Sequence, residues 1–100
     1  MKVGRPVIHT RAALLDHALR LSAEFGYNRV TRDQLASAAG MSTGQVSNLF
    51  GTMTQLRRAI MSAAVARNDL IVIAQGLINK EPKALALPDD LKLRALEQMI

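Results

Sequence analysis

A helix-start pattern that occurs three times between residues 31 and 55 constrains this chain more than any other feature. A hydroxyl residue is followed three positions later by glutamine at Thr31–Gln34, Ser42–Gln45 and Thr52–Gln55. This spacing is typical of a capping box, in which the hydroxyl accepts a hydrogen bond from an early backbone N–H and the glutamine side chain bonds back to the first residue. The pattern predicts three helices that begin directly after these hydroxyl residues.

Glycines mark where the first two of these helices end. Gly40 and Gly51 follow them, and glycine is the residue that most easily adopts the left-handed conformation that stops a helix. The sequence thus predicts two short helices, roughly 32–39 and 43–50, joined by a tight turn. Helices of this length do not persist alone in water, so both are expected to pack against other elements.

Apolar residues recur at helical spacing on both sides of this pair. One face of an upstream helix, with Thr10 as its candidate cap and Gly26 as its stop, carries Leu14, Ala18, Leu21 and Phe25. A stripe through a fourth helix after Thr52 carries Leu56, Ile60 and Ala63. The apolar run 70–73 has no second strand to pair with, so it is expected to be helical, either as a continuation or as a restart near Asn68. Pro82 and Pro88 bracket a predicted linker, and a last helix follows Pro88.

These elements predict an all-α fold with a three-helix, homeodomain-like helix-turn-helix core. The expected organisation is a flexible basic arm at residues 1–9, the core at 10–56, and one or two C-terminal helices within 57–100. In a helix-turn-helix, the second helix of the motif enters the DNA major groove. The positions that must be small, apolar or turning in such a motif comply: Leu35, Ala36, Ala39, Gly40, Met41, Val46 and Leu49.

The outward face of the second short helix is polar but uncharged. It carries Thr43, Gly44, Gln45, Ser47 and Asn48, and the chain has no charged residue from Gln34 to Leu56. A merely solvated face usually shows Lys and Glu. Gln and Asn can bond adenine edges bidentately, while Ser and Thr contact bases or phosphates. We interpret this face as a base-reading surface; the alternative is a polar surface without such a role.

The net charge of +5 is confined to the first part of the chain. Residues 1–60 carry eight Lys and Arg against three Asp and Glu, whereas residues 61–100 carry five of each. A polyanion partner accounts for this excess, and solubility is the alternative. Phosphate contacts are expected from Arg32, Arg57 and Arg58, and from helix N-termini. Arg5 lies in a Gly-Arg-Pro arm that could enter the minor groove or remain a plain disordered terminus.

From Leu14 to Leu56 the sequence resembles the DNA-binding domain of the tetracycline-repressor (TetR) family. The resemblance rests on the stretches LLDHALRL (14–21), AEFGY (23–27), VT (30–31), LASAAGMSTG (35–44) and FGT (50–52). It implies a homodimer that represses transcription by occupying a palindromic operator. It also implies DNA contacts from Thr31, Ser42, Thr43, Gly44, Gln45, Ser47 and Asn48.

The sequence departs from the family pattern at several positions. Ser47 replaces a usual tyrosine and Leu49 a usual histidine, while Thr43 and Met53 stand where lysines are frequent. The contact pattern is therefore expected to differ. Ser22 replaces a usual core aromatic and Phe25 a usual surface residue, which suggests a slightly rotated first helix.

Family members normally carry a large helical domain with a small-molecule pocket after the fourth helix. Residues 57–100 are too few to enclose such a pocket, so no inducer and no cofactor are expected. The apolar C-terminal part is predicted to form a dimer interface, and the alternative is that it only completes the monomer's core. The predicted interface residues are Leu70, Ile71, Ile73, Leu77, Leu93, Leu96 and Ile100.

Other functional classes are disfavoured by the sequence. Cysteine is absent, His9 and His17 are the two histidines, and no cluster has metal-ligand spacing, so neither an enzyme nor a metal site is expected. No apolar run is long enough to span a membrane and no signal peptide is recognisable, so a cytoplasmic location is expected. The main rival interpretation is a helix-turn-helix protein-interaction module, such as an antitoxin, whose C-terminal helices bind a partner protein. RNA binding ranks third because the three aromatic residues leave no stacking platform.

Overall fold

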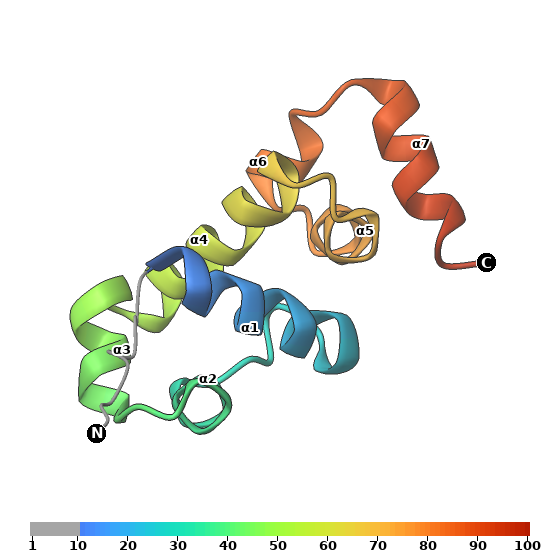
Figure 1. The fold of residues 1–100 in the computed structure, drawn as a ribbon. Coiled ribbons are helices and arrows are strands. Elements are labelled where there is room, and N and C mark those ends of the chain that lie inside the picture. The colour runs from blue at the N-terminus through green and yellow to red at the C-terminus, as the bar shows by residue number, and fades with distance from the viewer. Residues whose placement is uncertain (1–10) are drawn as a thin grey trace.

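The computed structural model describes residues 11–100, in which all regular secondary structure is helical (Figure 1). The helices are α1 (Arg11–Phe25), α2 (Arg32–Ala39), α3 (Thr43–Phe50), α4 (Met53–Ala66), α5 (Leu70–Ile78), α6 (Pro82–Leu85) and α7 (Asp89–Glu97). The all-α prediction is confirmed. Within this part of the chain, no helix combines the length and the apolar character needed to cross a bilayer. The predicted arm at 1–9 and the Thr10 cap lie outside the described residues.

The three predicted capping boxes are all present and define where α2, α3 and α4 begin. In each box the hydroxyl accepts from the backbone N–H of the glutamine, at 3.1 Å for Thr31, 3.2 Å for Ser42 and 3.1 Å for Thr52. Each glutamine Oε1 in turn accepts from the backbone N–H of the capping residue, at 2.8–3.0 Å. The bounds of α2 and α3 are those that the sequence predicted.

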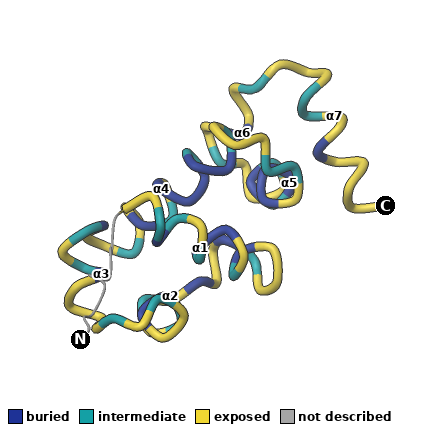
Figure 2. Tube along the Cα trace, in the orientation of Figure 1, coloured by how far each residue is buried: buried dark blue, intermediate teal, exposed yellow. Residues whose placement is uncertain are grey.

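The helices form a single core that runs from the helix-turn-helix end to α5. Helices α1, α2, α3 and α4 pack against one another, α5 and α6 pack on α4, and α7 packs on α5. In Figure 2 the buried stretches follow the inner sides of α1, α4 and α5, whereas α7 is mostly exposed. The largest fully buried hydrophobic side chains are Leu14, Leu35, Leu56, Ile60, Met61 and Ile73.

The predicted apolar face of α1 is wrong at its last position. Phe25 is 47% exposed, whereas Ser22 is fully buried one turn after Ala18. The Ser22 hydroxyl donates to the Ala18 carbonyl at 2.7 Å, which satisfies this polar group inside the core. The buried face of α1 therefore continues through Ser22, and Phe25 stays at the surface.

The C-terminal part decides between two alternatives and departs from the expectation once. Of the continuation and the restart near Asn68 that the sequence allowed, the structure shows the restart. Helix α5 follows Asp69, whose carboxylate caps it by accepting from the Val72 N–H at 3.3 Å, and Asn68 takes a left-handed conformation. The predicted linker between the two prolines contains the short helix α6, because Pro82 suits a first helical turn and Ala84 is fully buried.

Candidate nucleic-acid interface

The turn between α2 and α3 fixes the relative orientation of the two motif helices. Gly40 adopts φ 70° and ψ 38°, the left-handed conformation that strains residues with a side chain. The Met41 N–H then donates to the Ala36 carbonyl at 2.9 Å and closes the end of α2. Leu35 and Ala36 of α2 are buried. The turn therefore brings α3 against α2 at a defined angle, as a helix-turn-helix requires.

Helix α3 has one buried side and one exposed side. Val46 and Phe50 are buried and Leu49 packs against the core in part. The exposed positions at its start and along its outer side are Ser42, Thr43, Gly44, Gln45 and Asn48, and Ser47 is half-buried. The predicted base-reading residues therefore lie on one accessible, uncharged surface, which we call the α3 outer face (Ser42–Gln45, Ser47 and Asn48).

Two amides on the α3 outer face, Gln45 and Asn48, are not equally available to a ligand. The Gln45 Oε1 accepts from the Ser42 N–H at 2.8 Å as part of the capping box. A bidentate contact with adenine needs both the acceptor and the donor of an amide, so such a contact would compete with the cap of α3. Asn48 is exposed and makes no side-chain hydrogen bond to any other residue between 11 and 100. Asn48 is thus the better placed of the two to read a base edge.

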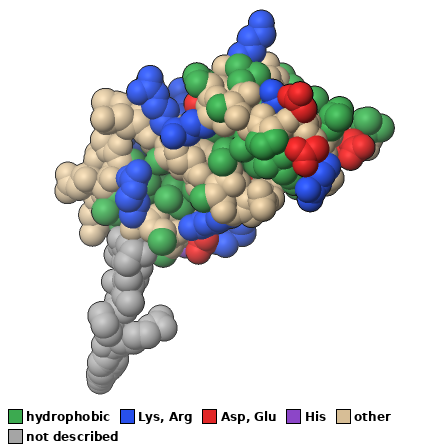
Figure 3. Space-filling model, turned by 90° about the horizontal axis from the view of Figure 1, so that it is seen from above, with side chains coloured by type: hydrophobic (Ala, Val, Ile, Leu, Met, Phe, Trp, Pro, Cys, Tyr) green, Lys and Arg blue, Asp and Glu red, His purple; other side chains and the backbone are tan. Residues whose placement is uncertain are grey.

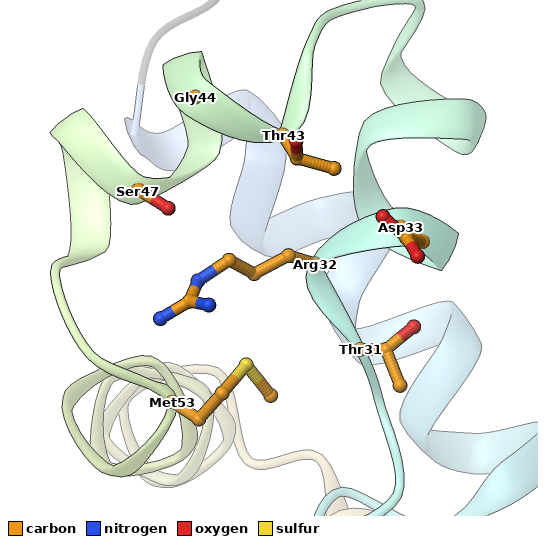
Figure 4. Close-up of a pocket in the computed structure, with 7 residues that line it drawn as sticks. All are labelled: Thr31, Arg32, Asp33, Thr43, Gly44, Ser47 and Met53. Atoms are coloured by element: carbon orange, nitrogen blue, oxygen red, sulfur yellow. The ribbon is translucent and has the colours of Figure 1, made fainter.

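A hollow of about 370 Å³ lies beside the α3 outer face (Figure 4). The first turns of α2, α3 and α4 surround it, and its lining residues are Thr31, Arg32, Asp33, Thr43, Gly44, Ser47 and Met53. The N-terminus of a helix presents backbone N–H groups and partial positive charge, which favour anions. Three such termini face one hollow, and this arrangement suits a phosphate group, although the Asp33 carboxylate at its rim opposes it.

Arg32 supplies the cationic group of this hollow. Its guanidinium lies between Ser47 and Met53 in Figure 4. The Nη2 atom donates to the Gly51 carbonyl at 3.3 Å, while the buried Nε atom has no partner among residues 11–100. Arg32 therefore connects the start of α2 to the end of α3 by one long bond and keeps donor capacity for a ligand.

Arg57 and Arg58 lie away from this hollow. They line a second one, of about 320 Å³, with Tyr27 and Asn28 from the turn after α1 and with Glu81 from the start of α6. Burial raises the pKa of the Tyr27 phenol, and the Glu81 carboxylate adds to this effect while Arg57 opposes it. These two predicted phosphate contacts thus line a different hollow from the one beside the α3 outer face, and Arg5 lies outside the described residues.

Arg11 positions α3, and the sequence analysis missed this role. Its Nη1 donates to the Leu49 carbonyl at 3.0 Å, and its guanidinium carbon lies 4.6 Å from the centre of the Phe50 ring. The side chain thereby satisfies a carbonyl at the C-terminal end of α3, where a cation is favourable. Nothing in the local sequence reveals a contact between residues so far apart in the chain.

The predicted interface residues occupy three different environments. Ile73 is fully buried inside the monomer, so it offers no surface to a partner, and Leu70 and Leu77 pack partly against the core. The exposed members are Ile71, Leu93, Leu96 and Ile100. Hydrophobic side chains gather toward the right of Figure 3, the side on which Figure 1 places α5 and α7.

Two short capped helices, joined by a left-handed glycine with an exposed polar face on the second, define a helix-turn-helix DNA-binding domain. The family model for bacterial regulatory proteins of the tetR family matches residues 14–60, and this domain belongs to that family.

The similarity to one curated relative covers more of the chain than the family model does. The chain is 34% identical over 79 residues to the HTH-type transcriptional repressor Rv1474c of Mycobacterium tuberculosis, a match that covers 79% of this chain and 42% of the relative. The chain thus spans less than half the length of that protein. No solved structure matches the present chain significantly.

Replacing the two amides separately should distinguish their roles in the fold. Gln45→Ala removes half of the α3 capping box and should lower the free energy of unfolding by about 1 kcal/mol. Asn48→Ala removes an exposed side chain and should change it by less than about 0.5 kcal/mol. Urea unfolding followed by circular dichroism measures both values. Equal losses in the two variants would contradict the assigned cap.

Proposed function

We propose that this chain binds double-stranded DNA sequence-specifically and represses transcription as a homodimer on a palindromic operator. The observation that carries the proposal is the two-sided construction of α3, with Val46 and Phe50 buried and the α3 outer face exposed and uncharged. A helix presented in this way fits the major groove, where base edges carry a complete donor and acceptor code. The identity to a relative named as a transcriptional repressor supports repression as the outcome.

We assign base reading to the α3 outer face and phosphate binding mainly to arginines and helix N-termini. Asn48 reads a base edge. The Gln45 Nε2 donates to a base as well, because the capping box uses only the Oε1 of that side chain. Thr43 and Ser47 contact bases or phosphates. Arg32 and the helix N-termini around its hollow hold one phosphate. Arg57 and Arg58, on α4, neutralise backbone phosphates farther from α3, and Arg5 of the arm could reach the minor groove.

The homodimer proposal rests on the exposed apolar side chains of the C-terminal helices. Ile71 on α5 and Leu93, Leu96 and Ile100 on or after α7 are exposed in the monomer. Burial of such residues against a second copy removes apolar area from water. A two-fold dimer would place two α3 helices on the half-sites of a palindrome.

We also propose that the hollow beside Arg32 is not a small-molecule pocket. The hollow beside Arg32 is lined by Thr31, Asp33, Thr43 and Gly44, all exposed, rather than by the apolar walls that enclose a ligand. In this proposal the hollow binds a phosphate group of the DNA backbone.

Substitution of a base-reading residue and of a phosphate-binding residue should affect DNA binding differently. Asn48→Ala should cost about 1–3 kcal/mol on the preferred duplex, selected from a random pool, and leave other duplexes nearly unchanged. Arg58→Ala should weaken all duplexes alike and flatten the slope of log K against log salt by about one per subunit. Fluorescence anisotropy at several salt concentrations measures both. Unchanged specificity in Asn48→Ala would rule out its base contact.

A charge placed in the exposed apolar surface should dissociate the dimer. Leu93→Glu should convert a dimeric parent protein into a monomer, because it places a carboxylate where apolar area is buried. The matched control is Leu85→Glu, since Leu85 is an exposed leucine on α6 outside the predicted interface. Sedimentation equilibrium gives the masses. A parent protein that is monomeric at all concentrations would refute the dimer.

A further inference from the structure

The side chain of Gln75 joins the C-terminal helices to the turn that precedes α2. Gln75 is half-buried on α5, and its Oε1 accepts from the backbone N–H of Tyr27 at 2.8 Å. Its Nε2 donates to the backbone carbonyl of Ser22 at 2.8 Å. One amide therefore bonds to both sides of the point where α1 ends. We call this pair of bonds the Gln75 bridge.

The Gln75 bridge joins two backbone groups at the end of α1. The Ser22 carbonyl already accepts the last helical bond from the Gly26 N–H at 2.8 Å, and the Gln75 Nε2 donates to the same oxygen as a second partner. The Tyr27 N–H follows Gly26, whose φ of 98° turns the chain out of the helix. A partly buried backbone N–H needs a partner, and for Tyr27 that partner comes from α5.

The segment held by the Gln75 bridge leads directly into the proposed DNA-binding surface. Tyr27 and Val30 are buried, and the Arg29 N–H donates to the Gly26 carbonyl at 3.0 Å, so the turn is one packed unit. Thr31, which caps α2, and Arg32, which supplies the guanidinium of the hollow, come next. A shift of this turn therefore moves the start of α2 relative to α3.

We propose that Gln75 is a positioning residue for DNA binding, which sets the start of α2 through the Tyr27 turn without touching DNA. This inference rests on the proposed DNA-binding function of α2 and α3. It assigns α5 a role in DNA affinity in addition to its part in the core. A second contact runs in parallel, since Asn28 of the same turn donates to Asn79 at the end of α5 at 3.3 Å.

The test replaces Gln75 by a residue of similar length that lacks the amide group and keeps only a weak thioether acceptor. In Gln75→Met the amide proton of Tyr27 should exchange with solvent at least about tenfold faster, because it loses its acceptor, while amides in the middle of α4 keep their protection. Affinity for the preferred duplex should fall by roughly tenfold, a size found for residues that couple two parts of a protein without contacting the ligand. Hydrogen exchange by NMR and fluorescence anisotropy give the two values.

The matched control separates positioning from a general loss of stability. The control is Ile73→Val, which removes one buried methyl group from the same helix, α5. The Ile73 side chain makes no hydrogen bond to the Tyr27 turn. This variant should leave Tyr27 exchange and DNA affinity unchanged at a temperature where both variants are folded. Equal weakening of DNA binding in the two variants would overturn the proposal, and so would full DNA affinity in Gln75→Met.

A second variant keeps the inference testable if Gln75→Met does not fold. Gln75→Glu retains the oxygen that accepts from Tyr27 but cannot donate to Ser22 at neutral pH. It should keep the Tyr27 amide protected and lose less than about tenfold in affinity for the preferred duplex relative to the parent protein. Loss of Tyr27 protection in Gln75→Glu would contradict the bridge. A parent protein that binds no duplex would overturn the proposed function, and the exchange measurement tells that failure apart because it needs no DNA.

Discussion

The burial of Val46 and Phe50 is the interaction on which the rest of this molecule depends. Helix α3 is too short to persist in water by itself, so its existence and its orientation both follow from the side that it buries. Arg11 reinforces this contact from outside by stacking on Phe50 and bonding to the Leu49 carbonyl. The exposed side of α3 is then free to be polar, because it contributes little to the packing that holds the helix.

The distribution of charge follows from this two-sided helix. No charged residue lies between Gln34 and Leu56, so the surface offered to base edges consists of amides and hydroxyls whose hydrogen bonds depend on direction. Two guanidinium groups, those of Arg11 and Arg32, bond to the C-terminal end of α3 and to Gly51 directly after it. Arg57 and Arg58, on α4, line a different hollow. In the proposed complex, uncharged groups read the bases while arginines and helix N-termini attract the phosphates.

Much of the helix-turn-helix could be predicted because its signals are local. The capping boxes and the turn at Gly40 involve residues within five positions of one another, and they gave the bounds of α2 and α3 correctly. The predictions that failed depend on distant contacts. Whether Ser22 or Phe25 completes the buried face of α1, and whether Ile73 faces the core or solvent, is decided by packing between helices. The Gln75 bridge and the Arg11 contact join residues more than 35 positions apart, and no local pattern indicates them.

The placement of the α3 outer face against DNA is tested most directly by NMR titration of the labelled protein with its preferred duplex. Our account predicts that the largest amide shifts fall on residues 42–48, with a second group at Thr31 and Arg32 near the hollow. Shifts concentrated on α5 and α7, with the amides of α3 unmoved, would contradict it.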